Sequence, residues 1–417
     1  MSPILDAGAR ATDPPAGLLS KGETLSRLSL QGFPPRMRAI ASTVPTTVMT
    51  TDELLELFEG RLSEELETSL RSIGVEQRHS VLANHASALI NPAAQLHPTT
   101  STTGMAVAAI RGALERADLP DAKRIGLLVS VSNTESRQLP GLGPEILAQD
   151  GGLLPRSVAI ANLSAQGCAT LLKGAELAGW YLCAHPDRLA LLVAAEAHTP
   201  WFSGIPQARR YLSFRELRTG NAKGAGDERA TLSLIQAALF GDGAVALVLE
   251  AEGPSPALGP FVHLTNRDRD DGELLTMDGG GTAQPLLSGR PRYTMAASVP
   301  RRGAAYAAAT VKALHECVAE PEGGYYRYLI HTGSRKILNG VCDSLGLSSE
   351  DPRVRTSYDV LGQWGNLSAA SIGFMLEREP NLAGPALLSA FGVGFSASAG
   401  KCLPAGYDGG GRVAPDA

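Results

Sequence analysis

Residues 158–175 read VAIANLSAQGCATLLKGA, and this stretch decides the predicted fold. Val158–Leu163 is an apolar run of strand length, and Ala169–Leu182 is an apolar run of helix length. Because both runs are apolar on more than one face, we predict a sheet covered on both sides by helices. Cys168 lies between the two elements, directly after Gly167, which permits a sharp strand-to-helix turn.

The same alternation of strands and helices continues on both sides of this stretch and predicts an α/β fold. A helix is expected from Thr51, since Thr50 and Glu53 have the spacing of a capping box. Further predicted strands are Met37–Ala41, Ile125–Val131, Leu189–Ala195, Val245–Leu249, Tyr328–Ile330 and Ala386–Ser389, and further predicted helices are Met105–Ala117, Gly303–Ala319, Lys336–Leu345 and Leu367–Glu379.

The 417 residues are expected to divide into an extension and two halves. Residues 1–33 are rich in Pro, Gly and Ser and lack periodicity, which predicts a mobile N-terminal extension. Residues 34–252 and 253–417 repeat the order of strand, glycine turn and buried helix. Two long stretches, Ser203–Arg229 and Asn266–Arg292, are expected to be irregular loops.

Composition and the lack of certain motifs argue against several classes of function. The net charge of −5 and the 5% of aromatic residues do not favour nucleic-acid binding. The longest apolar runs are far too short to cross a bilayer, and the N-terminus has no apolar signal region, so no membrane partner is expected. The five cysteines form no CxxC pair and the histidines no HExxH motif, which predicts a reduced, cytoplasmic protein without a metal site.

Three polar residues lie where predicted elements meet, and each has two interpretations. Cys168 precedes a helix, where the macrodipole favours the thiolate, but a lone cysteine is more often a core residue. His331 ends a predicted strand, where open α/β sheets place functional groups. Asn366 precedes a helix and is, by itself, explained equally well as an N-cap.

Taken in chain order, five short motifs resemble those of type III polyketide synthases of the chalcone-synthase kind, and more distantly 3-oxoacyl-carrier-protein synthase III. The resemblance implies a thiolase-like αβαβα layered fold built from two similar halves, a homodimer, and a buried site where the halves meet. The motifs are Gln166-Gly167-Cys168, Leu239–Ala244 (LFGDGA), His331-Thr332-Gly333, Gly365–Ser368 (GNLS) and Phe391–Gly394 (FGVG).

The resemblance also implies an acyltransferase that performs decarboxylative Claisen condensation to give a polyketide. Cys168 would accept an acyl starter as a thioester, and His331 would pair with the thiolate and lower its pKa. His331 and Asn366 would hydrogen-bond to the thioester oxygen of a malonyl-type extender while CO₂ leaves. Acyl-CoA or acyl-carrier-protein thioesters would be the substrates, with no metal or redox cofactor.

Five further residues are expected to bind substrate by the same resemblance, although packing also explains the three side chains among them. Phe202 and Tyr293 would be gatekeepers of the cavity, and Tyr293 would make its mouth more polar. Leu139 would extend into the cavity of the neighbouring subunit. Gly392 and Gly394 would let backbone N–H groups face the pocket.

Two departures from the family pattern leave other functions open. Leu62–Arg71 is mostly acidic where the family carries basic residues for CoA, which leaves room for a carrier-protein-dependent ketosynthase or acyltransferase performing a single step. The stretch Ser203–Arg229 carries four arginines, at 209, 210, 215 and 218, and is either a replacement anion-binding flap or a solvated loop. A non-catalytic partner subunit is the third alternative, but such subunits lose the nucleophile and this chain keeps Cys168.

Overall fold

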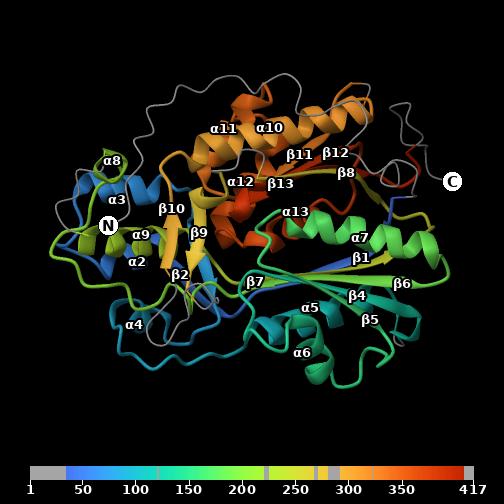
Figure 1. Cartoon of the computed structure of the whole chain (residues 1–417), viewed down its shortest axis with the longest axis horizontal. Coiled ribbons are helices and arrows are strands. Elements are labelled where there is room, and N and C mark those ends of the chain that lie inside the picture. Colours follow the sequence, from blue (N-terminus) through green and yellow to red (C-terminus); the bar gives the residue numbers. More distant parts are fainter. Residues whose placement is uncertain are drawn as a thin grey trace.

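The computed structural model describes residues 34–119, 122–219, 225–266, 271–279, 292–321 and 323–407. Figure 1 shows five stacked layers, in which helices form the two outer layers and the central one, and strands form the two layers between them. This arrangement confirms the predicted α/β fold of αβαβα type. Residues 1–33, the predicted mobile extension, lie outside the described residues.

Within the described residues, nine strands are linked in the order β11-β12-β13-β8-β1-β7-β6-β4-β5. One half of this order consists of β1 (Arg36–Thr43), β4 (Ile125–Ser132), β5 (Ala159–Ser164), β6 (Leu189–Glu196) and β7 (Gly243–Glu250). The other half consists of β8 (Ala257–Thr265), β11 (Arg327–Ile330), β12 (Ala386–Gly392) and β13 (Ser396–Leu403). The two halves are linked where Arg36 of β1 pairs with Ala257 of β8, and each forms its own layer (Figure 1).

The helices cover both faces of each strand layer. α5 (Thr102–Arg116) and α6 (Leu142–Gln149) form one outer layer, and α10 (Val299–Cys317) and α11 (Arg335–Ser344) form the other. α7 (Thr170–Ala184) and α13 (Ser371–Glu377) lie between the two strand layers (Figure 1). β6 is buried along its whole length because helices lie on both of its faces. No helix in the described ranges combines the length and apolar character needed to cross a bilayer.

The predicted capping box begins a smaller region beside these layers. The Thr50 side chain accepts a hydrogen bond from the Glu53 backbone N, and the Glu53 carboxylate accepts one from the Thr50 backbone N, which starts α2 (Thr51–Glu56). α3 (Glu64–Arg71), α4 (His85–Ile90) and the two-stranded antiparallel sheet of β2 (Thr47–Thr50) and β3 (Gln77–Ser80) complete this region. The short 3₁₀ helices are Ala122–Arg124, Asp271–Leu274, Pro352–Val354, Ser368–Ala370 and Val393–Phe395.

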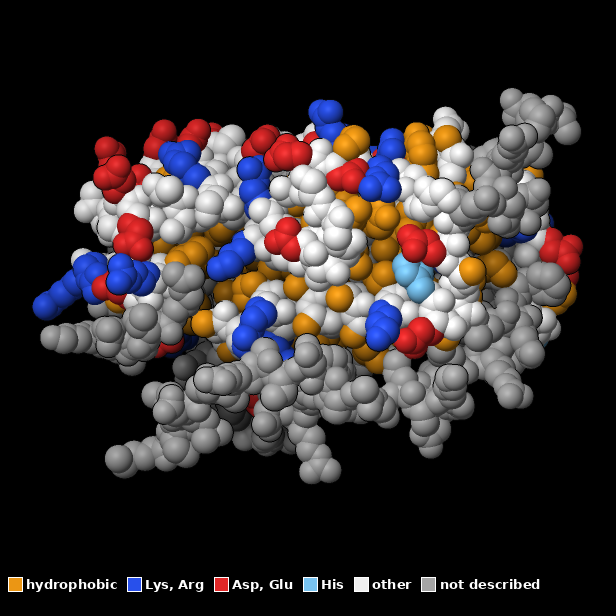
Figure 2. Space-filling model, turned by 90° about the horizontal axis from the view of Figure 1, so that it is seen from above, with side chains coloured by type: hydrophobic (Ala, Val, Ile, Leu, Met, Phe, Trp, Pro, Cys, Tyr) orange, Lys and Arg blue, Asp and Glu red, His pale blue; other side chains and the backbone are white. Residues whose placement is uncertain are grey.

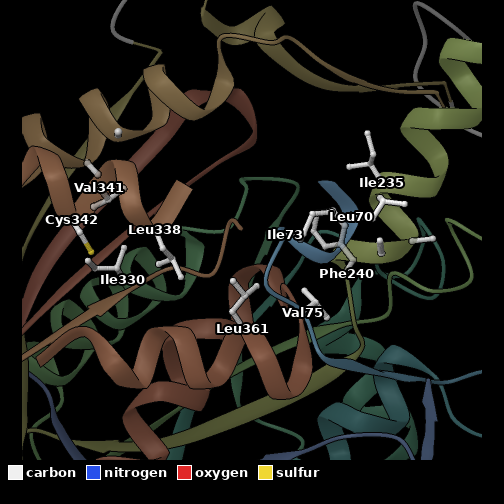
Figure 3. Close-up of a cluster of buried hydrophobic side chains, with 14 of the residues drawn as sticks. Leu70, Ile73, Val75, Ile235, Phe240, Ile330, Leu338, Val341, Cys342 and Leu361 are labelled. Atoms are coloured by element: carbon white, nitrogen blue, oxygen red, sulfur yellow. The ribbon is translucent and has the colours of Figure 1, made fainter. Parts of the chain in front are cut away.

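An apolar cluster joins this region to the layers of the second half. Figure 3 shows Leu70, Ile73 and Val75 facing Ile235 and Phe240 on one side and Leu361 on the other. Burial of this apolar surface is the main force that holds the elements together. The remaining labelled members come from β11 and α11, and the cluster also includes residues of α9 (Ala225–Leu239) and α12 (Arg355–Trp364).

The prediction of two irregular loops was wrong in part. α8 (Phe214–Thr219) and the start of α9 lie within Ser203–Arg229. The signal that we missed is a capping interaction, since the Glu216 carboxylate accepts from the Ser213 backbone N at 2.8 Å. The second stretch contains β9 (Leu275–Asp278) and the first residue of β10 (Arg292–Met295), which pair as antiparallel strands. Residues 220–224, 267–270 and 280–291 lie outside the described residues.

Candidate active site

A cavity of about 530 Å³ lies where the carboxyl ends of strands from both halves meet. Ser132 and Ser164 end β4 and β5, His331 follows β11, and Gly392 ends β12, and all four residues line the cavity. Carboxyl ends of strands are the usual place for ligands in α/β folds. The cavity brings together the three predicted catalytic residues, because it is lined by Cys168, His331 and Asn366.

The turn that carries Cys168 is held by close backbone contacts. Gly167 has a φ of 80°, a conformation that favours glycine. A Cβ atom on Gly392 would lie 2.3 Å from the backbone N of Cys168 and 3.1 Å from its Sγ, so no side chain fits at this position. Gly394 also lines the cavity and has a φ of 67°. Gly392 therefore lies beside the thiol, and both predicted glycines line the cavity.

A largely buried hydrogen-bond network connects the Cys168 thiol to the Glu196 carboxylate. The Sγ of Cys168 lies 3.4 Å from the Oγ of Ser368. The Nδ2 of Asn133 donates to that Oγ at 3.0 Å and to Glu196 Oε1 at 2.8 Å, and its Oδ1 accepts from the Gly167 N at 2.9 Å. Glu196 is fully buried and also accepts from the Thr134 hydroxyl at 2.7 Å. One carboxylate thus fixes both the nucleophile turn and the serine beside it.

Burial keeps both the thiol and the imidazole neutral. It raises the pKa of the Cys168 thiol to about 12, with the Glu196 charge adding to the shift and the Ser368 hydrogen bond opposing it. Burial lowers the pKa of His331 to about 3. The prediction that the site lowers the pKa of Cys168 was therefore wrong, because burial disfavours the thiolate.

This finding predicts how Cys168 reacts with an alkylating reagent. At a pKa of about 12, roughly one thiol in ten thousand is ionised at about pH 8. We expect the rate of carbamidomethylation by iodoacetamide to rise about tenfold per pH unit from about pH 7 to about pH 10, since only the thiolate reacts. Peptide mass spectrometry measures this rate. A plateau near neutral pH would instead indicate a preformed thiolate–imidazolium pair.

His331 and Asn366 each present one nitrogen to the cavity. The Nδ1 of His331 is buried and has no partner among the described residues, so the accessible nitrogen is Nε2. The Oδ1 of Asn366 accepts from the backbone N of Ser368 at 2.7 Å, which leaves Nδ2 as the donor toward the cavity. The N-cap interpretation of Asn366 was wrong, because Leu367 is the N-cap of the short helix Ser368–Ala370 and the bond to Ser368 closes a local turn. The catalytic interpretation stays a prediction.

The predicted gatekeepers lie in an aromatic wall of the cavity. Phe202 and Tyr293 both line it, with ring centroids 6.1 Å apart in an edge-to-face arrangement. Burial raises the pKa of Tyr293, so its hydroxyl stays protonated. Phe240, 5.3 Å from Phe202, completes the wall. The LFGDGA motif contains Phe240, but the motif alone does not predict that this residue lines the cavity.

Leu139 is the one predicted site residue that the structure does not bring to the cavity. Its side chain is 85% exposed, and it does not line the cavity of its own chain. An exposed leucine on a loop is compatible with a contact to a neighbouring subunit, which stays a prediction. Three residues that the sequence analysis missed, Asn133, Glu196 and Ser368, support the thiol instead.

The buried network predicts a large stability effect at Glu196. Glu196→Ala leaves the Asn133 backbone N–H and the Thr134 hydroxyl without their acceptor, and we expect a loss of about 2–4 kcal/mol in the free energy of unfolding. Urea denaturation measures this loss. Glu377→Ala is the matched control, because it removes only an ion pair with Arg116, whose side chain is 55% exposed, and should cost at most about 1 kcal/mol. Equal losses in the two variants would contradict the account.

The acidic residues in Leu62–Arg71, where the resembled family carries basic ones, are explained by the local helix. Glu64, Glu65 and Glu67 lie in the first turn of α3, where negative charge is stabilised by the helix macrodipole. Figure 2 shows acidic and basic side chains interspersed on the face seen from above. Among the arginines of the suggested flap, Arg210 forms an ion pair with Glu216 at 2.8 Å. The flap stays a prediction.

Comparison with known proteins agrees with this geometry. No family model matches the chain. An alpha-pyrone synthesis polyketide synthase-like protein of Mycobacterium tuberculosis is 28% identical over 283 residues, which cover 66% of this chain and 62% of that protein. The 3,5-dihydroxyphenylacetyl-CoA synthase of Streptomyces toyocaensis is 23% identical over 359 residues, or 82% of each chain. A beta-ketoacyl-[acyl-carrier-protein] synthase III of Synechococcus is 25% identical over 287 residues, or 66% of this chain and 74% of that one.

Solved structures extend the likeness to most of the chain. The 1,3,6,8-tetrahydroxynaphthalene synthase of Streptomyces coelicolor, a bacterial type III polyketide synthase, has a TM-score of 0.69 at 21% identity and covers 89% of this chain and 99% of its own. The 3-oxoacyl-(acyl carrier protein) synthase III of Pseudomonas aeruginosa has a TM-score of 0.63 at 22% identity, covering 92% and 100%. The chain therefore has the thiolase-like fold that its motifs predicted, and its sequence relatives include polyketide synthase-like proteins and beta-ketoacyl-[acyl-carrier-protein] synthases III.

Proposed function

We propose that this protein is an acyltransferase that condenses an acyl thioester starter with malonyl-type extender units by decarboxylative Claisen chemistry, giving a polyketide. The observation that carries the proposal is that Cys168 from one half and His331 and Asn366 from the other line a single cavity. The sequence relatives support the same class of reaction, although the chain spans only 62% of the length of the Mycobacterium tuberculosis protein.

Loading of the starter begins from a neutral pair. His331 Nε2 takes the thiol proton as the Cys168 sulfur attacks the thioester carbon of the starter, and the carrier leaves as a thiolate that takes a proton from water. His331 then keeps its proton. The resulting imidazolium is disfavoured by burial until a negative charge forms beside it.

Extension supplies that negative charge. Loss of CO₂ from the malonyl-type extender leaves an enolate, whose oxygen accepts hydrogen bonds from His331 Nε2 and Asn366 Nδ2. The enolate carbon attacks the Cys168 thioester, the carbon–sulfur bond breaks, and the thiolate takes the proton back from His331. The neutral thiol and imidazole are restored, and no metal or redox cofactor enters the cycle.

Radiolabelled malonyl-CoA tests the proposal directly. We expect incubation with a medium-chain acyl-CoA to give labelled products longer than the starter and an acyl group on Cys168. The absence of both, with CoA and with carrier-protein thioesters, would refute the proposed condensation.

A second candidate is a carrier-protein-dependent enzyme that performs one condensation or acyl transfer. The acidic first turn of α3 favours it, since carboxylates repel CoA phosphates, and beta-ketoacyl-[acyl-carrier-protein] synthases III are among the relatives. Intact-protein mass spectrometry separates the two functions. Acylation of Cys168 from carrier protein but not from CoA would establish the second.

The protein is also proposed to be a homodimer, joined through the edge strand β5. This strand pairs only with β4 within the described residues, and Ile160 on it is 37% exposed. An exposed apolar edge favours pairing with a second strand. Light scattering is expected to give a dimer, and Ile160→Glu a monomer. A monomeric wild-type protein would refute this assembly. The cytoplasmic location stays a prediction.

A further inference from the structure

A second imidazole lies in the wall of the cavity and has no part in the steps above. His198 follows β6 by two residues and is 5% exposed, and it lines the same cavity as Cys168. Its ring is stacked against Phe240, with centroids 4.5 Å apart, and lies 6.2 Å from Phe202. An imidazole therefore lies in the aromatic wall next to the two phenylalanine rings.

Two hydrogen bonds fix the orientation of this ring. The backbone N of His198 donates to Asp242 Oδ1 at 2.7 Å, and ring atom Nδ1 lies 3.2 Å from the carbonyl oxygen of Gly241. A carbonyl oxygen only accepts, so Nδ1 must be the donor. In the neutral ring the other nitrogen, Nε2, then carries a lone pair and acts as a base.

The lone pair of Nε2 is available to a ligand. Nε2 has no hydrogen-bond partner among the described residues, and it is not completely buried. His85 differs, since its Nδ1 is sealed without a partner and it does not line the cavity. Because His198 and Cys168 line the same cavity, Nε2 is the ring nitrogen left to contact an acyl chain bound to Cys168.

We infer that His198 is a second proton-transfer residue, which closes a ring in the poly-β-keto chain that the proposed function would build on Cys168. A chain with ketones at its third and fifth carbons carries an acidic enol O–H, which is a suitable partner for a neutral imidazole. Phe240 and Phe202 provide apolar surface for the rest of the chain.

The inferred step is balanced within the cavity. Nε2 of His198 takes the proton of the enol at the fifth carbon, and the enol oxygen forms a bond to the thioester carbon of the chain. The carbon–sulfur bond to Cys168 breaks and releases a six-membered lactone. The thiolate takes up one proton in the cavity and His198 gives up one, so that the free enzyme returns without any oxidant or reductant.

The experiment bypasses condensation, so that failure of this inference and failure of the proposed function are distinguishable. The substrate is the N-acetylcysteamine thioester of 3,5-dioxohexanoate, which loads Cys168 without an extension step. The test variant is His198→Asn, which keeps a donor for the Gly241 carbonyl and removes Nε2. The matched control is His79→Asn, because His79 Nδ1 also bonds a carbonyl, that of Pro45 at 2.6 Å, and His79 does not line the cavity.

We expect His198→Asn to lower enzyme-dependent lactone formation at least about tenfold, while the acyl group accumulates on Cys168 in the intact-protein mass spectrum. His79→Asn should match the wild type within about twofold, because His79 lies outside the cavity. Unchanged lactone formation in His198→Asn would overturn the inference, and so would equal losses of acylation and lactone, which would mark a structural role. If the wild-type protein closes this ring but does not use malonyl thioesters, the proposed condensation fails while the role of His198 stands.

Discussion

Cys168→Ala is expected to lower the rate of chain extension by roughly four orders of magnitude or more, since no other thiol among the described residues lines the cavity. The same variant should still release CO₂ from malonyl-CoA, because His331 and Asn366 remain in place to stabilise the enolate. Product formation by chromatography and CO₂ release by coupled assay measure the two activities separately.

The control for this variant is Cys183→Ala, which removes an exposed thiol outside the cavity. It should leave both activities unchanged. If Cys168→Ala kept chain extension, the acyl group would have to reside elsewhere, and the proposed mechanism would be wrong. If it lost CO₂ release together with extension, the thiol would take part in decarboxylation as well.

Asn366→Asp is expected to slow CO₂ release from malonyl-CoA by roughly 10²–10³-fold, the usual effect of losing one donor to a developing oxyanion. The substitution keeps the oxygen that accepts from the Ser368 backbone N at 2.7 Å. It replaces the Nδ2 donor with an acceptor, so the turn is retained while the hydrogen bond to the enolate is lost. Steady-state kinetics should show the loss with little change in thermal unfolding.

Asn339→Asp provides the matched control, because the Oδ1 of Asn339 accepts from the Tyr358 hydroxyl at 2.8 Å and the residue does not line the cavity. It should leave CO₂ release within about twofold of the wild type. A normal rate in Asn366→Asp would mean that Asn366 serves only to hold its turn. That outcome would leave His331 as the sole proposed donor to the enolate.

The sequence predicted the layers well because apolar periodicity reports burial. The continuous apolar run at Leu189–Ala195 was identified as a buried strand, and β6 is buried along its whole length. The helix that begins at Phe214 was missed, because its capping signal, Ser213 with Glu216, lies in a polar stretch without sustained periodicity. Local hydrogen bonds of this kind give only a weak pattern in a single sequence.

The sequence predicted the reacting residues of the candidate site, but not the hydrogen-bond network that holds them in place. Cys168 and His331 were found because motifs mark them, and the cavity joins them. Asn133 and Glu196 were missed, because their importance comes from contacts between segments 63 residues apart. The direction of the pKa shift at Cys168 was also missed, since the extent of burial depends on how both halves close over the thiol.

The central claim is that Cys168 carries the growing chain during decarboxylative condensation. Intact-protein mass spectrometry after rapid mixing with an acyl-CoA starter and malonyl-CoA tests it most directly. The account predicts one starter adduct on the peptide that contains Cys168, followed by heavier adducts that each add one two-carbon unit, with one CO₂ released for each. An unmodified Cys168 with continued product formation, or the absence of any adduct with CoA and carrier-protein thioesters alike, would contradict it.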